Sequence, residues 1–197
     1  MKKTRNLPKQ TKQSGEVRII AGLWRGRKLS VLNAEGLRPT SDRVKEMLFN
    51  WLMHDVAGCY CLDCFAGSGS LGIEALSRQA KAVVFLEKFA NAASVLRNNV
   101  AHLTGANASV INTDTLQYLA QKNTQQPFEL VFIDPPFHNN LVPEVIALLE
   151  RNDWLVSKAL IYVETEKDHL ALQLPANWQL LKEKVTGQVI SRLFQRL

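Results

Sequence analysis

The stretch from Cys61 to Gly72 reads Cys-Leu-Asp-Cys-Phe-Ala-Gly-Ser-Gly-Ser-Leu-Gly, and it decides the fold of this chain. Its apolar beginning predicts a strand, its end predicts a helix, and the glycines between them predict a tight turn. Glycine adopts positive φ without strain and lets the backbone approach a ligand closely. Gly67, Gly69 and Gly72 fit the pattern G-x-G-x-x-G, which is weakly specific in isolation but here follows a strand and opens a helix. We therefore interpret the turn as the binding loop of a nucleotide-like cofactor.

The segments after residue 59 alternate between apolar strands and helices. The expected strands are Tyr60–Phe65, Ala82–Glu87, Ser109–Asn112, Leu130–Asp134 and Leu160–Glu164, and the expected helices are residues 70–79, 89–103, 115–121 and 141–151. This alternation predicts an α/β fold with a parallel sheet covered on both faces. Trp178–Val185 and Val189–Arg196 instead flank a turn at Gly187 and predict an antiparallel hairpin. A seven-stranded sheet that ends in such a hairpin resembles the Rossmann-like class I methyltransferase fold.

The region before this sheet is basic and includes a second, smaller hairpin. Residues 1–15 are polar without periodicity, which predicts a flexible basic arm. Residues 16–36 predict a basic β-hairpin extension, with strands at Val17–Ala21 and Arg27–Leu32 on either side of a turn at Trp24-Arg25-Gly26.

Residues 37–197 are expected to form the main domain, which begins with a helix. Thr40 or Ser41 can cap this helix, and Asp42 suits its first turn. Its apolar face is expected at Val44, Met47, Leu48, Trp51 and Leu52, which follow helical spacing.

The net charge of +6 is concentrated at the beginning of the chain. Residues 1–45 hold 12 Lys/Arg and 3 Asp/Glu, whereas the remaining 152 residues hold 12 Lys/Arg and 15 Asp/Glu. A basic segment in front of a mildly acidic body suits the phosphate backbone of a nucleic acid. A solvated tail is the alternative for residues 1–15. The candidate RNA contacts are Arg18, Trp24, Arg25, Arg27, Lys28 and Arg38.

Composition disfavours several other classes of protein. No apolar run reaches the ~18 residues of a membrane span, and no apolar leader follows Met1, so we expect a cytoplasmic protein. Cys59, Cys61 and Cys64 crowd into one segment without the second cluster that a zinc site needs, and we expect no metal. Cys61 and Cys64 lie three residues apart and should face opposite sides of a strand.

Two acidic residues at predicted strand ends complete the cofactor constellation. Glu87 ends the second strand, 18 residues after Gly69, where a carboxylate can accept hydrogen bonds from both hydroxyls of a ribose. Asp114 follows the third strand and can accept from an adenine amino group. Asp114 is also a good helix cap, and the sequence leaves both roles open.

The candidate catalytic motif is Asp134-Pro135-Pro136-Phe137, at the end of a buried strand. Two prolines remove backbone donors, stop the strand and leave carbonyl groups free. An exocyclic base amine is a poor nucleophile, and acceptance of its N–H groups by Asp134 and the Pro135 carbonyl would orient it for methylation. Asp134 could also take the released proton, and Phe137 offers a face for stacking on the base.

Other methyl-transfer reactions fit this motif less well. Methylation of a base carbon uses a cysteine near the fourth strand, whereas all three cysteines precede Gly67. Methylation of a ribose oxygen commonly uses lysine, and none adjoins Asp134. His138 either contacts substrate or is a solvent-exposed loop residue. The chain has no room for the large target-recognition domain of a duplex-DNA enzyme, which favours a shaped RNA with an accessible base.

Several segments together resemble the RsmD family over about residues 16–196. They are Arg18–Leu29, Leu37–Asn50, Asp63–Ala75, Asp134–Phe137 and Glu183–Gln188. The resemblance implies methyl transfer from S-adenosylmethionine to N2 of a guanine, guanine 966, in 16S ribosomal RNA of an assembled or nearly assembled small subunit. It implies that Asp63 and the loop Phe65-Ala66-Gly67-Ser68-Gly69 bind the methionine part, Glu87 the ribose and Asp114 the adenine, and that Thr40 and Arg43 close over the methionine end. We expect a monomer.

Three alternatives stay open at the level of sequence. An amino-methyltransferase acting on another RNA or DNA base would carry the same motif. An NAD-dependent oxidoreductase is supported only by the literal glycine pattern, and nothing after residue 165 offers the substrate domain that it needs. A non-catalytic RNA-binding module with a relic cofactor site is the third.

Overall fold

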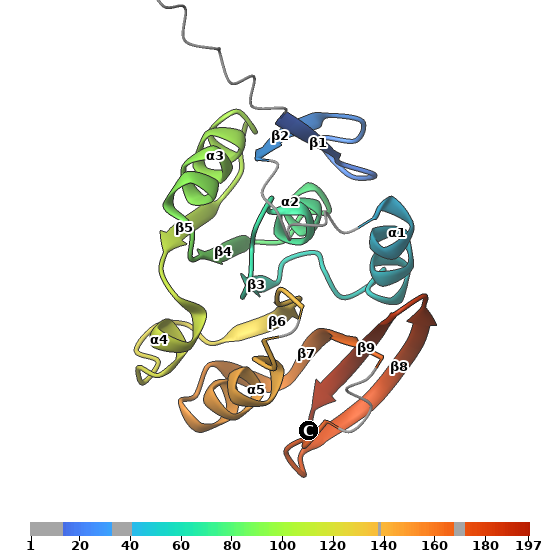
Figure 1. Cartoon of the computed structure of the whole chain (residues 1–197), viewed down its shortest axis with the longest axis vertical. Coiled ribbons are helices and arrows are strands. Elements are labelled where there is room, and N and C mark those ends of the chain that lie inside the picture. The colour runs from blue at the N-terminus through green and yellow to red at the C-terminus, as the bar shows by residue number, and fades with distance from the viewer. Residues whose placement is uncertain (1–13, 33–40, 138, 168–171) are drawn as a thin grey trace, which may run out of the picture.

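The computed structural model describes residues 14–32, 41–137, 139–167 and 172–197, which form a seven-stranded sheet with helices on both faces and a separate two-stranded sheet (Figure 1). The strands are β1 (Ser14–Arg18), β2 (Lys28–Leu32), β3 (Tyr60–Asp63), β4 (Ala82–Glu87), β5 (Ala108–Asn112), β6 (Phe128–Ile133), β7 (Leu155–Glu166), β8 (Trp178–Thr186) and β9 (Val189–Arg196). The helices are α1 (Asp42–Trp51), α2 (Ser70–Ser77), α3 (Ala90–Ala101), α4 (Thr115–Leu119) and α5 (Val142–Arg151).

The large sheet has the strand order β5-β4-β3-β6-β7-β9-β8. Pairs among β3, β4, β5, β6 and β7 are parallel, whereas β9 pairs antiparallel with both β7 and β8. The predicted α/β class, the seven strands and the terminal hairpin are thereby confirmed. The chain runs outward from β3 in one direction and from β6 in the other, and ligands bind at the carboxyl ends of strands at such a switch point.

Each face of the large sheet has its own apolar core. One core includes Leu48 of α1, Leu71 of α2 and Leu96 of α3, and the other includes Leu119 of α4 and Val145 of α5. Figure 1 shows the same division, with α1, α2 and α3 on one side of the sheet and α4 and α5 on the other.

The helix after residue 41 forms as predicted. Ser41 is its N-cap and its side chain accepts a hydrogen bond from the Val44 N–H, while Leu48 and Leu52 are buried. Phe49 and Lys45 are also buried. The burial of Lys45 was not predicted by the apolar pattern. The Lys45 ammonium is satisfied because it donates to the Arg18 carbonyl at 2.5 Å and pairs with Asp42 at 3.0 Å.

The first hairpin exists, but its first strand lies earlier than expected. β1 covers Ser14–Arg18, whereas the sequence predicted a strand through Ala21 and a flexible arm through residue 15. The strand ends early because the N–H groups of Ile20 and Ala21 bond to the Glu74 carboxylate at 2.9 and 3.0 Å instead of to another strand.

The segment between β1 and β2 is fixed to the C-terminal end of α2. The Leu23 N–H donates to the Ser77 carbonyl at 2.7 Å, and the Trp24 N–H donates to Ser77 Oγ at 3.1 Å. Gly22 has φ +80°, and a Cβ there would lie 1.9 Å from the Ser77 carbonyl oxygen. The close approach therefore requires glycine, and it holds residues 22–24 against the end of α2.

Candidate active site

The glycine loop joins β3 to α2 at the carboxyl edge of the sheet. Gly67 and Gly69 have φ of 51° and 77°, and Gly69 is the N-cap of α2. Gly72 is needed for a different reason, because a Cβ there would lie 2.2 Å from Cε1 of Phe85 on β4. The first two glycines thus shape the loop, and the third allows α2 to pack closely on the sheet.

Glu87 organises the loop from the end of the neighbouring strand. Its side chain is buried, with Oε2 accepting from the Gly67 N–H at 2.8 Å and Oε1 accepting from the Phe89 N–H at 2.7 Å. Each carboxylate oxygen can accept more than one hydrogen bond, so this arrangement is compatible with the predicted contact to a ribose. Phe89 is 64% exposed directly beside it, an aromatic group that the sequence interpretation did not include.

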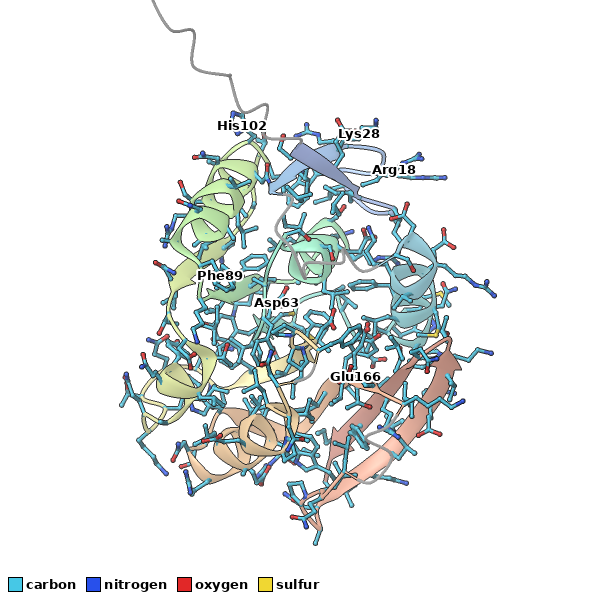
Figure 2. The ribbon with its side chains drawn as sticks, viewed as in Figure 1. Arg18, Lys28, Asp63, Phe89, His102 and Glu166 are labelled. Atoms are coloured by element: carbon cyan, nitrogen blue, oxygen red, sulfur yellow. The ribbon has the colours of Figure 1, made fainter. Side chains whose placement is uncertain are left out.

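Asp63 lies beneath the loop at the end of β3 and is buried (Figure 2). Oδ2 accepts a hydrogen bond from the Gly72 N–H at 3.1 Å. Burial raises the pKa of Asp63 to about 7, opposed by the backbone hydrogen bonds and reinforced by the negative charges of Asp134 and Glu87. Asp63 is therefore repelled electrostatically by two other acidic side chains around the loop.

Asp114 is the N-cap of α4, the second of the two roles that the sequence left open. Oδ1 accepts from the N–H groups of Leu116 and Gln117 at 3.0 and 3.3 Å. Oδ2 pairs with Lys88 at 3.0 Å, and the hydrogen bond from Lys88 is the main reason that the pKa of Asp114 is lowered. The Thr115 hydroxyl also donates to the Cys64 carbonyl, which holds this turn against the loop after β3. A contact to adenine stays a prediction.

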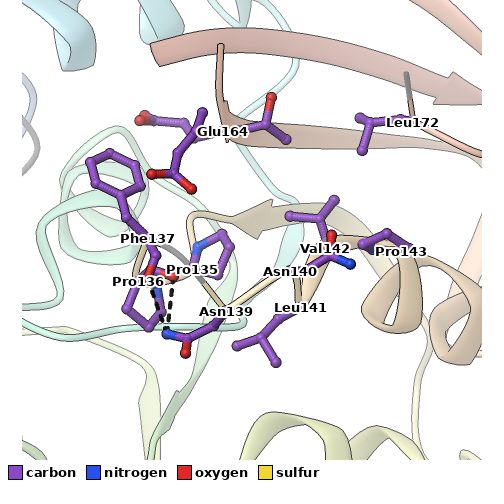
Figure 3. A pocket seen from close by; sticks show the side chains of 12 residues that line it. Pro135, Pro136, Phe137, Asn139, Asn140, Leu141, Val142, Pro143, Glu164 and Leu172 are labelled. Carbon is purple, nitrogen blue, oxygen red and sulfur yellow. Dashed lines mark hydrogen bonds between the residues drawn. The ribbon is translucent and has the colours of Figure 1, made fainter. Parts of the chain in front are cut away.

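The candidate catalytic turn follows β6 and lines a pocket at the same edge of the sheet (Figure 3). Asp134 is half-buried, and Phe137 is 41% exposed. The Asn139 side chain donates to the carbonyls of Pro136 and Phe137 at 3.4 and 3.2 Å. The pocket is lined by Pro135, Pro136, Phe137, Asn139, Asn140, Leu141, Val142, Pro143, Glu164, Thr165, Glu166 and Leu172.

Glu164 belongs to this site, although the sequence interpretation treated it only as the end of a strand. Val163 is paired with Ile133 across β7 and β6, so the next residues, Glu164 and Asp134, lie side by side. Glu164 is buried, and burial followed by the charge of Asp134 raises its pKa to about 8. The available sequence signal was an acidic residue at the carboxyl end of a predicted parallel strand, as for Glu87.

Stability should fall as the pH rises through the pKa values of Asp63 and Glu164. Both values lie above those of the unfolded chain, so between about pH 4 and pH 8 the folded state binds more protons, and raising the pH lowers the free energy of unfolding. Glu164→Gln cannot ionise and should unfold at a temperature a few degrees above wild type at about pH 9, with the advantage lost at about pH 5. Thermal unfolding at both pH values measures this, and an equal difference at both would contradict it.

The candidate RNA contacts separate into exposed and buried residues. Arg18, Arg25, Arg27 and Lys28 are exposed, and Figure 2 shows Arg18 and Lys28 on the outer side of the hairpin. Trp24 was expected at an RNA interface, but it is only 6% exposed because its ring packs in the core with α1 and α2. The buried ring argues against a stacking contact between Trp24 and RNA.

The structure does not bring the hairpin turn to the catalytic pocket. Gly22–Trp24 packs on Ser77 at the far end of α2 from the glycine loop, about 12 Å along the helix axis. Arg27 lies at the same end, where it donates to the His102 carbonyl at 3.1 Å. A nucleic acid that touches both features must therefore span the length of α2.

Of the four remaining candidate residues, the structure describes one. Arg43 is exposed on the first turn of α1. Arg38, Thr40 and His138 lie outside the described residues.

Two of the three cysteines lie in the core, and Cys59 is partly buried against it. Cys61 and Cys64 are buried in the two different cores, on opposite faces of the sheet. Burial raises the pKa of Cys59 to about 11, and it raises the pKa values of the other two well above the ordinary value. All three thiols are therefore protonated at neutral pH and are poor nucleophiles. The described side chains include no cluster that could hold a metal ion.

The acidic side chains around the loop fit S-adenosylmethionine better than NAD. Asp63 is repelled by the negative charges of Asp134 and Glu87, so a ligand with a sulfonium and an ammonium group would relieve this repulsion. The pyrophosphate of NAD would instead add negative charge to an acidic site. The sheet order and the position of the Asp134 turn beside this loop place the protein among the S-adenosylmethionine-dependent methyltransferases with a Rossmann-like fold.

Comparisons with known proteins give the family. The family model described as Conserved hypothetical protein 95 matches residues 17–195. Ribosomal RNA small subunit methyltransferase D of Haemophilus influenzae is 61% identical over 92% of this chain and 94% of its own length. The protein of the same name from Escherichia coli K12 is 52% identical over 93% of this chain and 91% of its own length. The chain belongs to this family, the RsmD family of methyltransferases.

Solved structures agree with the fold. A putative methyltransferase from Escherichia coli superimposes with a TM-score of 0.86 and 49% identity, covering 92% of this chain and 98% of that one. A putative methylase from Haemophilus influenzae superimposes with a TM-score of 0.80 and 56% identity, covering 93% of this chain and 99% of that one. A putative methyltransferase complexed with SAH has a TM-score of 0.70 at 14% identity, covering 96% of this chain and 58% of that one. At this low identity the likeness supports the fold alone. No helix in the described part of the chain is long and apolar enough to cross a membrane.

Proposed function

We propose that this protein methylates the exocyclic N2 of a guanine in 16S ribosomal RNA, guanine 966 by family resemblance, in an assembled or nearly assembled small subunit. The observation that carries the proposal is the Asp134–Phe137 turn beside the glycine loop at the switch point of the sheet. The names of the Haemophilus and Escherichia relatives support ribosomal RNA of the small subunit as the substrate. The protein acts as a monomer in the cytoplasm.

The cofactor site in this proposal is formed by the acidic residues and the loop between them. Asp63 and residues 65–69 hold the methionine part together with Thr40 and Arg43, Glu87 holds the ribose, and Asp114 the adenine. S-adenosylmethionine supplies a methyl group on a positively charged sulfur. Every other part of the reaction is performed by side chains and carbonyls of the protein.

The catalytic turn orients the target amine. The Asp134 carboxylate and the Pro135 carbonyl accept the two N–H groups, which directs the nitrogen lone pair toward the methyl group and makes the attack nearly unimolecular. Asp134 then accepts the proton that leaves the nitrogen. Phe137, partly exposed at the pocket, stacks on the base. Asn139 holds the turn because it donates to the carbonyls of Pro136 and Phe137.

Purified small subunits from a strain that lacks this gene provide the direct test. Incubation with the protein and methyl-labelled S-adenosylmethionine should place the label in N2-methylguanosine at one position of the 16S RNA. Label in another base would exclude guanine N2 as the target, and labelled subunits without any modified nucleoside in the RNA would exclude RNA as the substrate. Competition by NAD for cofactor binding would revive the oxidoreductase alternative.

Removing positive charge from the hairpin should weaken RNA binding without affecting cofactor binding. In the Arg25→Ala/Lys28→Ala double variant, we expect about 10-fold weaker binding to small subunits at ~0.15 M salt, and a slope of log affinity against log salt reduced by up to about 2. Arg151→Ala is the matched control, because Arg151 is exposed at the end of α5 on the opposite side of the sheet. Equal weakening in the control variant would argue against an interface at the hairpin.

A further inference from the structure

Glu164 is a buried acid that the mechanism above does not use. It lines the catalytic pocket opposite Pro135, Pro136 and Phe137, and it is only 7% exposed (Figure 3). The register of β6 and β7 places it directly beside Asp134, and adjacent strands lie about 4.8 Å apart. A second carboxyl group at this distance is unfavourable for the free protein, since burial and like charge both oppose its ionisation.

Glu164 is held in one orientation by Tyr162, two residues earlier on the same strand, β7. The Tyr162 hydroxyl donates to Oε1 at 2.6 Å and lies 3.1 Å from Ser191 Oγ on β9. Burial raises the pKa of Tyr162 well above its ordinary value, so the phenol stays protonated and keeps donating. Among the described residues, Glu164 is hydrogen-bonded through Oε1, and Oε2 is available to accept from a ligand in the pocket.

The position beside Asp134 corresponds to a particular ring atom of the target base. When the amine of a base is held by Asp134 and Pro135, one of the two ring atoms bonded to the amine-bearing carbon can face Glu164, which lines the same pocket. In guanine this atom can be N1, which carries a hydrogen. In adenine and cytosine the corresponding ring nitrogen carries a lone pair, and 2-aminopurine keeps the amine of guanine but lacks the N1 hydrogen.

We propose that Glu164 accepts the N1–H of the target base and so selects guanine over bases whose ring nitrogen lacks a hydrogen. This inference rests on the proposed methylation of guanine N2. In the free protein Glu164 is largely protonated below about pH 8, and donation from N1–H favours its ionised form. The carboxylate then accepts a charge-assisted hydrogen bond from N1–H, whereas a ring-nitrogen lone pair in the same place would be repelled. Tyr162 is a positioning residue, because it acts on the base only through Glu164.

The test compares guanine with 2-aminopurine at the methylated position of 16S RNA, in small subunits reconstituted from ligated RNA. For wild type, kcat/KM should be about 10- to 100-fold higher with guanine, the effect of one hydrogen bond to a charged acceptor. In Glu164→Ala, kcat/KM for the guanine substrate should fall by a similar factor. The kcat/KM values of the guanine and 2-aminopurine substrates should then be nearly equal. Glu164→Gln keeps a carbonyl oxygen and should retain part of the preference, and Tyr162→Phe should reduce it.

Three measurements separate this inference from its premises. Cofactor affinity and thermal unfolding of each Glu164 variant show whether the site is intact. An unchanged guanine preference in an intact Glu164→Ala protein would overturn the inference while leaving the proposed function standing, as would a wild-type enzyme that does not distinguish the two bases. Failure of wild type to methylate guanine-containing subunits would instead refute the proposed function itself.

Discussion

Replacing Asp134 with alanine should lower methyl transfer about 1,000-fold or more, because the variant loses both the orientation of the target amine and the acceptor of its proton. Asp134 follows a strand whose last residues are fully buried, so the turn is held by the sheet and should survive the substitution. Single-turnover rates with small subunits and excess S-adenosylmethionine measure the effect on the chemical step.

Asp134→Asn separates the two contributions. It keeps one carbonyl oxygen to accept an N–H but carries no charge, so its rate should lie between those of wild type and Asp134→Ala. Both variants remove a negative charge that raises the pKa values of Asp63 and Glu164, and those pKa values should fall. Asp153→Ala, at an exposed acidic residue paired with Lys122, is the control and should leave the rate unchanged. Wild-type turnover by Asp134→Ala would show that the catalytic assignment is wrong.

Replacing Glu74 with alanine should lower the free energy of unfolding by about 3–5 kcal/mol, the usual cost of breaking a buried ion pair. The Glu74 side chain is fully buried on α2, where it pairs with Arg78 at 3.0 Å. It also accepts the N–H groups of Ile20 and Ala21, so its loss leaves a guanidinium and two backbone donors without their acceptor. The melting temperature should fall by roughly 10 °C or more.

Thermal and urea unfolding test this prediction together with two further variants. Glu74→Gln keeps one acceptor oxygen and should lose about half as much stability as Glu74→Ala. Glu46→Ala removes an exposed glutamate of α1 and should change the unfolding free energy by less than about 0.5 kcal/mol. If Glu74→Ala were no less stable than Glu46→Ala, the hydrogen bonds of Glu74 would not be what fixes the N-terminal extension to α2.

Features that depend on local sequence were predictable. The strand–helix alternation, the glycine loop and the terminal hairpin are encoded by hydrophobic period and by residues with special φ, and the predicted elements after residue 59 form in the predicted order. β7 is longer than expected, because it covers Leu155–Glu166 where Leu160–Glu164 was predicted. β4 and β9 have the bounds that were predicted. Glu87 and Asp134 became candidates for the same reason, since each ends a predicted apolar strand and parallel strands end at one edge of the sheet. Asp63 was proposed from the family resemblance.

Features that depend on contacts between distant segments were decided by the tertiary structure. The sequence around Trp24 suggests an exposed aromatic residue in a basic turn. The Trp24 ring is instead buried, because the turn is hydrogen-bonded to Ser77, more than 50 residues later in the chain. The sequence suggests that Glu74 is a surface residue of a helix. Its carboxylate instead accepts hydrogen bonds from two N–H groups of the N-terminal extension. The pairing of Glu164 with Asp134 depends on the register between β6 and β7.

The glycine loop and the Asp134 turn were thus determined by the sequence itself, because their conformations are imposed by glycine and proline at fixed positions. Which charged and aromatic side chains surround them was decided only when the strands and α2 packed together. A hydrogen bond or a desolvated charge is a property of two segments in contact, and the period of a single segment carries no information about its partner.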